Sequence, residues 1–264
     1  MKIWVNTIVC NEENFIYFAI MSVIDYVDKV LIYDTGSDDK TVKIIEEIKK
    51  IKKDKIIFKQ VGKVDAQGLV NFRQKMLEGS DCDWILLLDG DEIWWESSIK
   101  KLVKKIKGEG RYIDGIVVPT IIPVGDIYHI QEEAAGEYEL LGLKGHFNLR
   151  AINKRLPGLR VEGLYPLEGF KTAQNLFIQD SDKTIFLDAP YLHTTHLVRS
   201  SVKRRFDKFK YELGKKVKEN FKFPEVLYKN YPALVKSPWE KASGTKLIVS
   251  KLLTPLRKFK RRLK

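Results

Sequence analysis

The first half of the chain alternates short apolar runs with longer segments in which apolar residues recur every three or four positions. The runs at 3–10 and 84–88 are almost entirely apolar, which is typical of strands buried on both faces. The segments between the runs have the spacing of amphipathic helices. We therefore predict strands at 3–10, 29–33, 55–61 and 84–88, and helices at 14–26, 40–50, 69–78 and 97–107.

This strand–helix alternation predicts an α/β fold with a mostly parallel central sheet and flanking helices. After residue 110 the pattern changes to isolated strands at 113–119, 147–152 and 184–192. A basic helical segment follows at 200–218. A second amphipathic segment, 246–264, carries Pro255, which is expected to kink or interrupt it. We divide the chain into a domain at 1–200 and a basic, largely helical C-terminal extension at 201–264.

Charge is distributed unevenly along the 264 residues. The formal net charge is +12, but residues 201–264 carry twenty Lys or Arg against five Asp or Glu. The first 200 residues are close to neutral, so a nucleic-acid-binding core is not indicated. A basic amphipathic tail suits contact with an anionic membrane surface. No apolar stretch approaches the length of a membrane span, and the N-terminus lacks a signal-peptide pattern. We therefore expect a cytoplasmic protein, with peripheral contact to the inner face of the membrane as an option that the basic tail leaves open.

Two cysteines, Cys10 and Cys82, match no zinc-binding spacing. Cys10 lies within an apolar run. We interpret both as buried structural thiols in a reducing compartment.

The strongest local motif is Asp89-Gly90-Asp91-Glu92, which directly follows the apolar run at 84–88. A buried strand therefore delivers two carboxylates to the carboxyl edge of the sheet, where α/β proteins bind ligands. The glycine between them permits close approach of another group. Oxygen ligands of this kind suit Mg²⁺ or Mn²⁺ bridging to a diphosphate. An acidic loop that caps the next helix is the structural alternative.

Two further polar motifs follow the first and second predicted strands. They are Asn11-Glu12-Glu13 and Asp34-Thr35-Gly36-Ser37. Each alone reads as a turn with a helix cap. Because neighbouring strand ends of one parallel sheet form a single crevice, the three motifs together predict a nucleotide site.

In order, spacing and strand context, these motifs resemble those of the family 2 glycosyltransferases with the GT-A fold. The resemblance covers about the first 110 residues. It implies a Rossmann-like domain and transfer of a sugar from a nucleotide-sugar donor, with UDP favoured, to an acceptor hydroxyl with inversion. The acceptor class is open between a glycan and a lipid-linked molecule. The resemblance also implies a divalent cation, Mn²⁺ or Mg²⁺.

The resemblance assigns roles to individual residues. Asn11 and Glu12 would lie beside the nucleoside, Asp34 would bind the base, and Gly36 would allow approach of the ribose. Asp89 would meet the ribose and diphosphate, and Asp91 would coordinate the cation. Arg73 stands where the family often has a phosphate-side Arg, although the Asn that usually follows it is missing.

The remaining assignments stay open. For the base that deprotonates the acceptor, Glu162 and Glu168 are both candidates, with Glu162 slightly preferred and Asp188 a weaker third. His193 and His196 are alternative additional metal ligands. Trp94 and Trp95 could stack on a sugar or anchor the core.

Three other functions fit parts of the pattern. A nucleotidyltransferase would need a Gly-rich, basic loop near the N-terminus, where this chain has Asn11-Glu12-Glu13. A phosphatase of the haloacid dehalogenase type would carry its Asp-x-Asp motif on the first strand rather than the fourth. A catalytically silent module that binds anions or membranes through the basic tail would not depend on Asp91.

Overall fold

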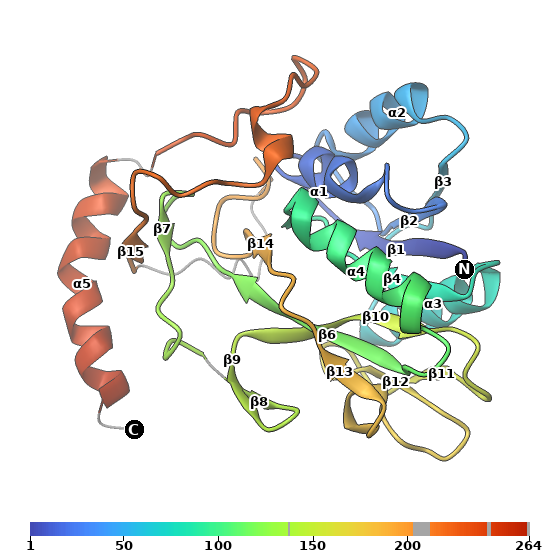
Figure 1. Cartoon of the computed structure of the whole chain (residues 1–264). Coiled ribbons are helices and arrows are strands. Elements are labelled where there is room, and N and C mark those ends of the chain that lie inside the picture. Colours follow the sequence, from blue (N-terminus) through green and yellow to red (C-terminus); the bar gives the residue numbers. More distant parts are fainter. Residues whose placement is uncertain (137, 203–211, 242–243, 263–264) are drawn as a thin grey trace.

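A mixed sheet of nine strands forms the centre of the protein (Figure 1). The structure is a computed structural model that describes residues 1–136, 138–202, 212–241 and 244–262. The strand order is β3-β2-β1-β4-β10-β6-β14-β5, and β13 pairs with β6. The strands are β1 (Ile3–Val9), β2 (Lys29–Asp34), β3 (Ile56–Gln60), β4 (Trp84–Leu87), β5 (Glu92–Trp94), β6 (Gly115–Ile121), β10 (Phe147–Asn153), β13 (Thr184–Phe186) and β14 (Tyr191–His193).

The sheet is parallel where the nucleotide motifs were predicted. β3, β2, β1 and β4 all run the same way, whereas β10 is antiparallel to both of its neighbours, β4 and β6. Val9 pairs with Asp34, so β1 and β2 end at the same level and their loops start side by side. The predicted α/β class with a mostly parallel sheet is confirmed.

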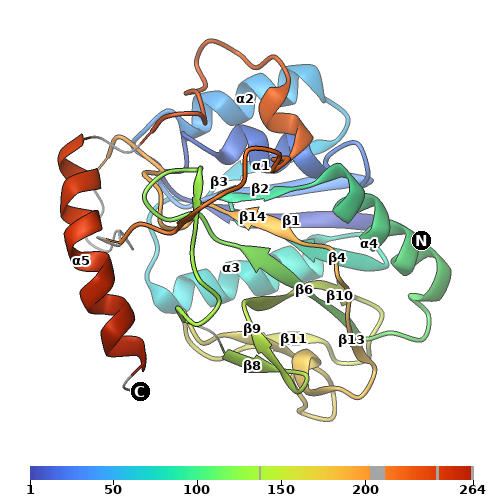
Figure 2. The same cartoon turned by 60° about the vertical axis from the view of Figure 1, so that its left-hand side comes forward.

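Four helices cover the two faces of the sheet: α1 (Ile16–Val23), α2 (Thr41–Ile51), α3 (Ala66–Gly79) and α4 (Glu96–Glu109). α1, α2 and α4 lie on one face and α3 on the other (Figure 2). Each helix lies within a few residues of its predicted range. Alternate strand residues serve the two faces, because Val30 and Ile32 belong to the larger core and Leu31 packs beside Met76 of α3.

Smaller elements surround the sheet. They are the pairs β11 (Arg160–Glu162) with β12 (Gly169–Lys171), β15 (Lys215–Lys216) with β7 (His129–Ile130) and β8 (Tyr138–Leu140) with β9 (Leu143–Gly145), and the 3-10 turns η1 (Ile178–Asp180) and η2 (Glu225–Tyr228). Two predictions need correction. The strand predicted at 184–192 is divided into β13 and β14, because Pro190 cannot donate to a ladder. The helix predicted at 200–218 falls partly on residues 203–211, outside the described residues, and 215–216 form β15 instead.

The C-terminal part both packs on the domain and extends from it. Phe223, Val226, Leu227 and Val235 belong to the main core. α5 (Gly244–Arg262) then stands at the edge of the molecule (Figure 1) and continues through Pro255 without interruption. In the described part of the chain, no helix is long and apolar enough to cross a membrane. The domain boundary at residue 200 remains a prediction.

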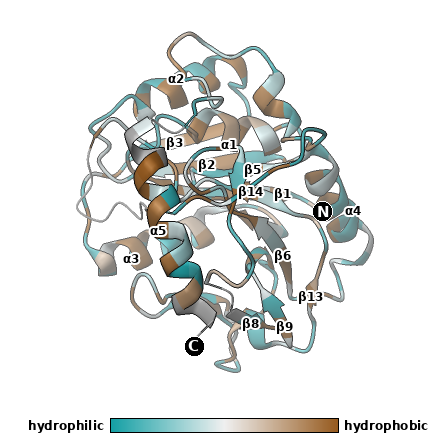
Figure 3. Ribbon diagram, turned by 90° about the vertical axis from the view of Figure 1, so that its left-hand side faces the viewer, coloured by the Kyte–Doolittle hydropathy of each residue, from teal (hydrophilic) through white to brown (hydrophobic). Residues whose placement is uncertain are grey.

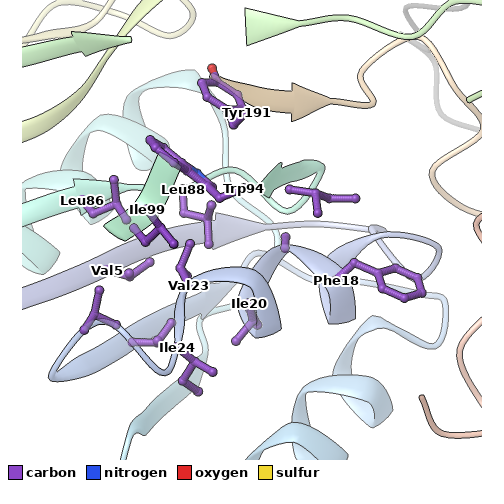
Figure 4. Packing of buried hydrophobic residues seen from close by; sticks show 14 of the residues in the cluster. Val5, Phe18, Ile20, Val23, Ile24, Leu86, Leu88, Trp94, Ile99 and Tyr191 are labelled. Carbon is purple, nitrogen blue, oxygen red and sulfur yellow. The ribbon is translucent and has the colours of Figure 1, made fainter. Parts of the chain in front are cut away.

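Part of the main core lies between α1 and the strands of the sheet (Figure 4). Residues of α1 such as Ile20 and Val23 pack with Val5 and Leu86 of the sheet. Each fully buried side chain of this kind contributes roughly 1.5–3 kcal/mol relative to exposure. This packing holds the loops after β1 and β4 on a rigid base.

Candidate active site

The Asp89-Gly90-Asp91 turn joins β4 to β5 and lies against the loop after β1. A Cβ atom added to Gly90 would lie 2.7 Å from Cγ of Glu12, so a glycine is needed for this contact. The close approach predicted at this glycine is therefore made by Glu12. The two aspartates differ in environment, because the Asp89 side chain is 39% exposed and that of Asp91 is 3% exposed.

The buried carboxylate of Asp91 is held by two basic side chains. Arg199 donates to its Oδ2 at 3.1 Å, and Nε2 of His193 lies 3.5 Å from its Oδ1. Burial alone would raise the pKa of Asp91, but His193 and Arg199 hold it well below its usual range. In return, Asp91 raises the pKa of His193 against the opposing effect of burial. Asp91 is therefore an anion and His193 favours its charged form.

Arg199 also donates to Glu12 at 2.8 Å, so one guanidinium joins the loop after β1 to the Asp-Gly-Asp turn. Its backbone carbonyl accepts a hydrogen bond from Asn14 N at 3.0 Å. Two neighbouring hydrogen bonds join the same segment to the loops after β1 and β2. Ser200 Oγ donates to Asp39 at 2.6 Å, and Ser201 N donates to Glu13 at 2.6 Å. Residues 198–201 thus form one wall of the site.

The loops after β1 and β2 are tied together. Asn11, at φ +55°, accepts from Asp38 N at 2.7 Å, and its own N–H donates to Ser37 Oγ at 2.8 Å. Asp34 accepts from the backbone N–H groups of Gly36 and Ser37 at 3.1 Å and from the Ser37 hydroxyl. Those three bonds use three of the roughly four accepting positions of a carboxylate. Asp34 therefore shapes its own loop and retains capacity for one further donor.

A second ion-pair cluster lies beside Asp89. Arg150 of β10 donates to Asp89 at 3.3 Å, to Tyr191 Oη at 3.0 Å, and to the fully buried Glu92. Burial raises the pKa of Glu92 to about 7, although Arg150 opposes this change. Tyr191 in turn stacks on Trp94, with ring centroids 5.2 Å apart. Arg150 consequently orients the exposed aspartate of the turn.

The two candidate bases occupy different settings on the β11–β12 hairpin. Glu162 is 44% exposed and pairs with Arg160 at 3.0 Å and Lys171 at 2.6 Å, and hydrogen bonds from these cations lower its pKa. Glu168 is 8% exposed and accepts from Arg73 at 2.9 Å. Its second oxygen, Oε2, is buried with no hydrogen-bond partner among the described residues. Two predicted site residues, Arg73 and Glu168, therefore contact each other.

These features match a known enzyme family. The sequence model of glycosyl transferase family 2 matches residues 4–162, which includes β1, β2 and the Asp-Gly-Asp turn. The chain belongs to glycosyl transferase family 2. No curated protein matches the sequence.

Two solved structures of S. aureus TarS show the same fold at low sequence identity. S. aureus TarS residues 1–349 in complex with UDP-GlcNAc matches with a TM-score of 0.50 and 17% identity, over 74% of this chain and 58% of that one. The longer TarS structure matches with a TM-score of 0.50 and 16% identity, over 74% of this chain and 37% of that one. A further match is glucosyl-3-phosphoglycerate synthase from Mycobacterium tuberculosis in complex with Mn²⁺, UDP and glucosyl-3-phosphoglycerate. Its TM-score is 0.44 and its identity 17%, over 73% of this chain and 71% of that one. The chain thus spans less than two thirds of the TarS chains.

In this member of family 2, the structure shows the surroundings of the remaining candidate residues. His193 contacts Asp91, whereas His196 forms an isolated bridge with Val124. Trp94 is a core residue, and Trp95 packs against Phe221. Asp188 is exposed, and its backbone carbonyl accepts from Lys101.

The residues present fit a divalent cation that is shared with a ligand. Oδ1 of Asp91 and Nε2 of His193 are 3.5 Å apart, and two ligands bound to one cation at about 2.1 Å lie roughly 3.0–3.5 Å apart. Within the described ranges, no three His, Cys, Asp or Glu side chains are grouped so that they could hold a metal ion. Mg²⁺ is commonly bound by one or two carboxylates together with substrate phosphates. The donor set therefore suits a cation that binds together with a diphosphate.

Four residues of the site have no role that the sequence pattern predicts. Glu92 stands inside the Asp89-Gly90-Asp91-Glu92 motif, and Arg199 stands three positions after His196. Arg150 sits in a strand, where a buried cation signals a buried anion nearby. Tyr191 had no distinguishing signal, because a buried tyrosine in a strand is ordinary.

Proposed function

We propose that this chain transfers a sugar from a UDP-sugar to an acceptor hydroxyl, with Mn²⁺ or Mg²⁺, in glycan, polysaccharide or glycolipid synthesis. The observation that carries the proposal is the meeting of the loop after β1 with the Asp-Gly-Asp turn after β4, where Gly90 contacts Glu12 and Arg199 links Glu12 to Asp91. The loop after β2 is hydrogen-bonded to the loop after β1. Such an edge of a parallel sheet is where α/β proteins bind nucleotides. The fold shared with TarS, whose structures hold UDP-GlcNAc and UDP, supports the choice of UDP.

Each group has a distinct task in this proposal. The remaining accepting position of Asp34 takes an N–H of the base, and Asp89 accepts from the ribose. Asp91 and His193 would hold the cation, with His193 releasing its proton on binding. When bound, the cation would offset charge on the diphosphate leaving group. Arg199 then keeps its hydrogen bond to Glu12 and lies beside the phosphates.

We assign the general base to Glu168 rather than to the initially preferred Glu162. The Glu162 carboxylate is already held between two cations, which makes it a weaker base. One oxygen of Glu168 is fixed by Arg73, and the other has no hydrogen-bond partner in the described part of the chain. Displacement with inversion needs one such carboxylate on the acceptor side.

The test combines binding and turnover. Thermal unfolding is followed with UDP, GDP, ADP and CDP, each with and without Mn²⁺, in the wild-type protein and in Asp91→Asn. A nucleotide present at 100 times its Kd should add about 2.7 kcal/mol of stability. We expect UDP with Mn²⁺ to stabilise the wild-type protein strongly, Mn²⁺ alone to do so weakly, and Asp91→Asn to lose the metal-dependent part.

Turnover is measured as release of UDP from UDP-GlcNAc and UDP-glucose, which needs no known acceptor. Release that depends on Mn²⁺ and on Asp91 supports a transferase. Cleavage of a nucleoside triphosphate instead would favour a nucleotidyltransferase. Absence of any nucleotide response would contradict the proposal and favour a silent anion-binding module.

A further inference from the structure

Helix α5 is attached to the domain through its polar side. Thr254 Oγ1 accepts a hydrogen bond from Leu213 N at 2.9 Å, Lys258 pairs with Glu132, and Ser250 is buried. These three residues follow each other at intervals of four and therefore lie on one face of the helix. A helix that packs on its own domain normally buries its apolar face. In α5 the polar face contacts the domain instead.

The opposite side of α5 is apolar and exposed. Ile248, Leu252, Leu256 and Phe259 follow each other at intervals of four, four and three residues, and each is between 61% and 69% exposed. Figure 3 shows the helix in front of the domain, with hydrophobic residues recurring along it. Leu263, the last member of the predicted stripe, lies outside the described residues. This arrangement leaves the described part of the apolar stripe, from Ile248 to Phe259, open to an external partner.

The charge of α5 restricts what that partner can be. The helix contains seven Lys or Arg and no Asp or Glu. Lys251 and Arg257 are exposed beside the stripe. A second copy docked through the same face would bring two such helices together, and their like charges would repel. An anionic surface with an apolar interior complements both features.

We propose that α5 binds the surface of an anionic lipid bilayer, with the stripe inserted among the acyl chains and the flanking cations at the headgroups. Interfacial helices have this combination of an apolar face and a basic polar face. Each cation near an anionic membrane strengthens binding about fivefold. This inference does not depend on the glycosyltransferase proposal.

The position of α5 relative to the candidate active site suggests what membrane binding would achieve. In Figures 1 and 2, β1 and β4 point toward the side of the molecule on which α5 lies. The carboxyl edge of the sheet, with Asp89 and Asp91, thus faces the same side. A protein resting on lipid through α5 holds this edge near the membrane surface, where a membrane-anchored acceptor would be found.

The experiment is co-sedimentation of the full chain with vesicles, without nucleotide. Phosphatidylcholine vesicles containing phosphatidylglycerol are compared with pure phosphatidylcholine, at about 0.05 M and about 0.5 M salt. We expect binding to the anionic vesicles at low salt and weaker binding at high salt. The double variant Leu252→Ser, Leu256→Ser should weaken binding by about tenfold or more.

Two controls make the outcome decisive. Ile51→Ser and Tyr112→Ser remove exposed apolar side chains elsewhere and should leave binding unchanged. Thermal unfolding verifies that the α5 variant is folded, and size-exclusion chromatography reports its oligomeric state. Binding that is insensitive to Leu252 and Leu256, or an apolar stripe that drives dimerisation instead, would overturn the proposal. Loss of nucleotide binding in Asp91→Asn with vesicle binding intact would separate the two proposals.

Discussion

Arg199 donates a hydrogen bond to Asp91 across 3.1 Å, although 108 positions separate them in the chain. The same nitrogen reaches Glu12, which is 187 positions away, at 2.8 Å. Both acids are buried. One cation therefore bridges two carboxylates that the sheet has brought together.

Replacing Arg199 with Met should lower the free energy of unfolding by about 3–5 kcal/mol, because two buried carboxylates lose their shared cation. Arg199→Lys should cost less, since it keeps the charge and loses the planar fork. Urea denaturation measures both. As a control, Lys236→Met removes an exposed pair with Glu240 and should cost under about 1 kcal/mol. Equal stability of Arg199→Met and the wild-type protein would rule out this role.

The pair of Arg150 and Glu92 should behave as a coupled unit. Arg150→Met leaves a fully buried carboxylate without its guanidinium and should cost about 3–5 kcal/mol. Adding Glu92→Gln should recover part of that loss, with a coupling energy of about 1 kcal/mol or more. Urea unfolding of the two single variants and the double variant gives the cycle. Strictly additive effects of the two substitutions would contradict the predicted coupling. If Arg150→Met fails to fold, a double variant that does fold would support the coupling.

Glu168 and Glu162 form a matched pair for testing the base, because they lie on the same hairpin. Glu168→Gln should reduce kcat about 10²–10⁴-fold while leaving UDP binding unchanged. Glu162→Gln should change kcat by no more than a few fold. Turnover of both variants is measured as release of UDP from UDP-GlcNAc and UDP-glucose. The reverse ranking would return the role to Glu162.

Cys82 should be almost inert toward alkylation in the native protein. Burial raises the pKa of its thiol to about 12, so its thiolate fraction at pH 8 is about a thousandfold below that of an ordinary cysteine. Because this pKa lies above the assay range, the rate should rise about tenfold per pH unit between pH 8 and 10. Iodoacetamide labelling read by peptide mass spectrometry tests this, with the denatured protein as reference. Native labelling as fast as denatured labelling at pH 8 would show that Cys82 is accessible and ionised.

Much of this architecture could be predicted from local patterns. The runs at 3–10 and 84–88 are strands because continuous apolar sequence suits a sheet covered on both faces. The family followed from the Asp-Gly-Asp turn and the two motifs after β1 and β2. These features depend on residues close in sequence, so they can be predicted from a single sequence.

The partners of those motifs could not be predicted in the same way. Arg150 reaches Asp89 because β10 lies between β4 and β6 with one particular register. Arg199 reaches Asp91 because a coil after β14 returns to the first loop. Strand insertion and loop return depend on tertiary packing, which local periodicity does not encode. The same reason explains why the pairing of Glu168 with Arg73, 95 positions away, could not be predicted from the sequence.

The seam between residues 11–14 and 198–201 also bears on the order of folding. The stretch that identifies the family ends at residue 162, whereas the cation that completes the acidic cluster is Arg199. Closing a loop between Glu12 and Arg199 costs more chain entropy than any contact within one β-α unit. We expect this wall to form after the sheet and to open before the sheet unfolds. The catalytic state of the protein would therefore be less stable than its fold, and donor binding would stabilise the last part to assemble.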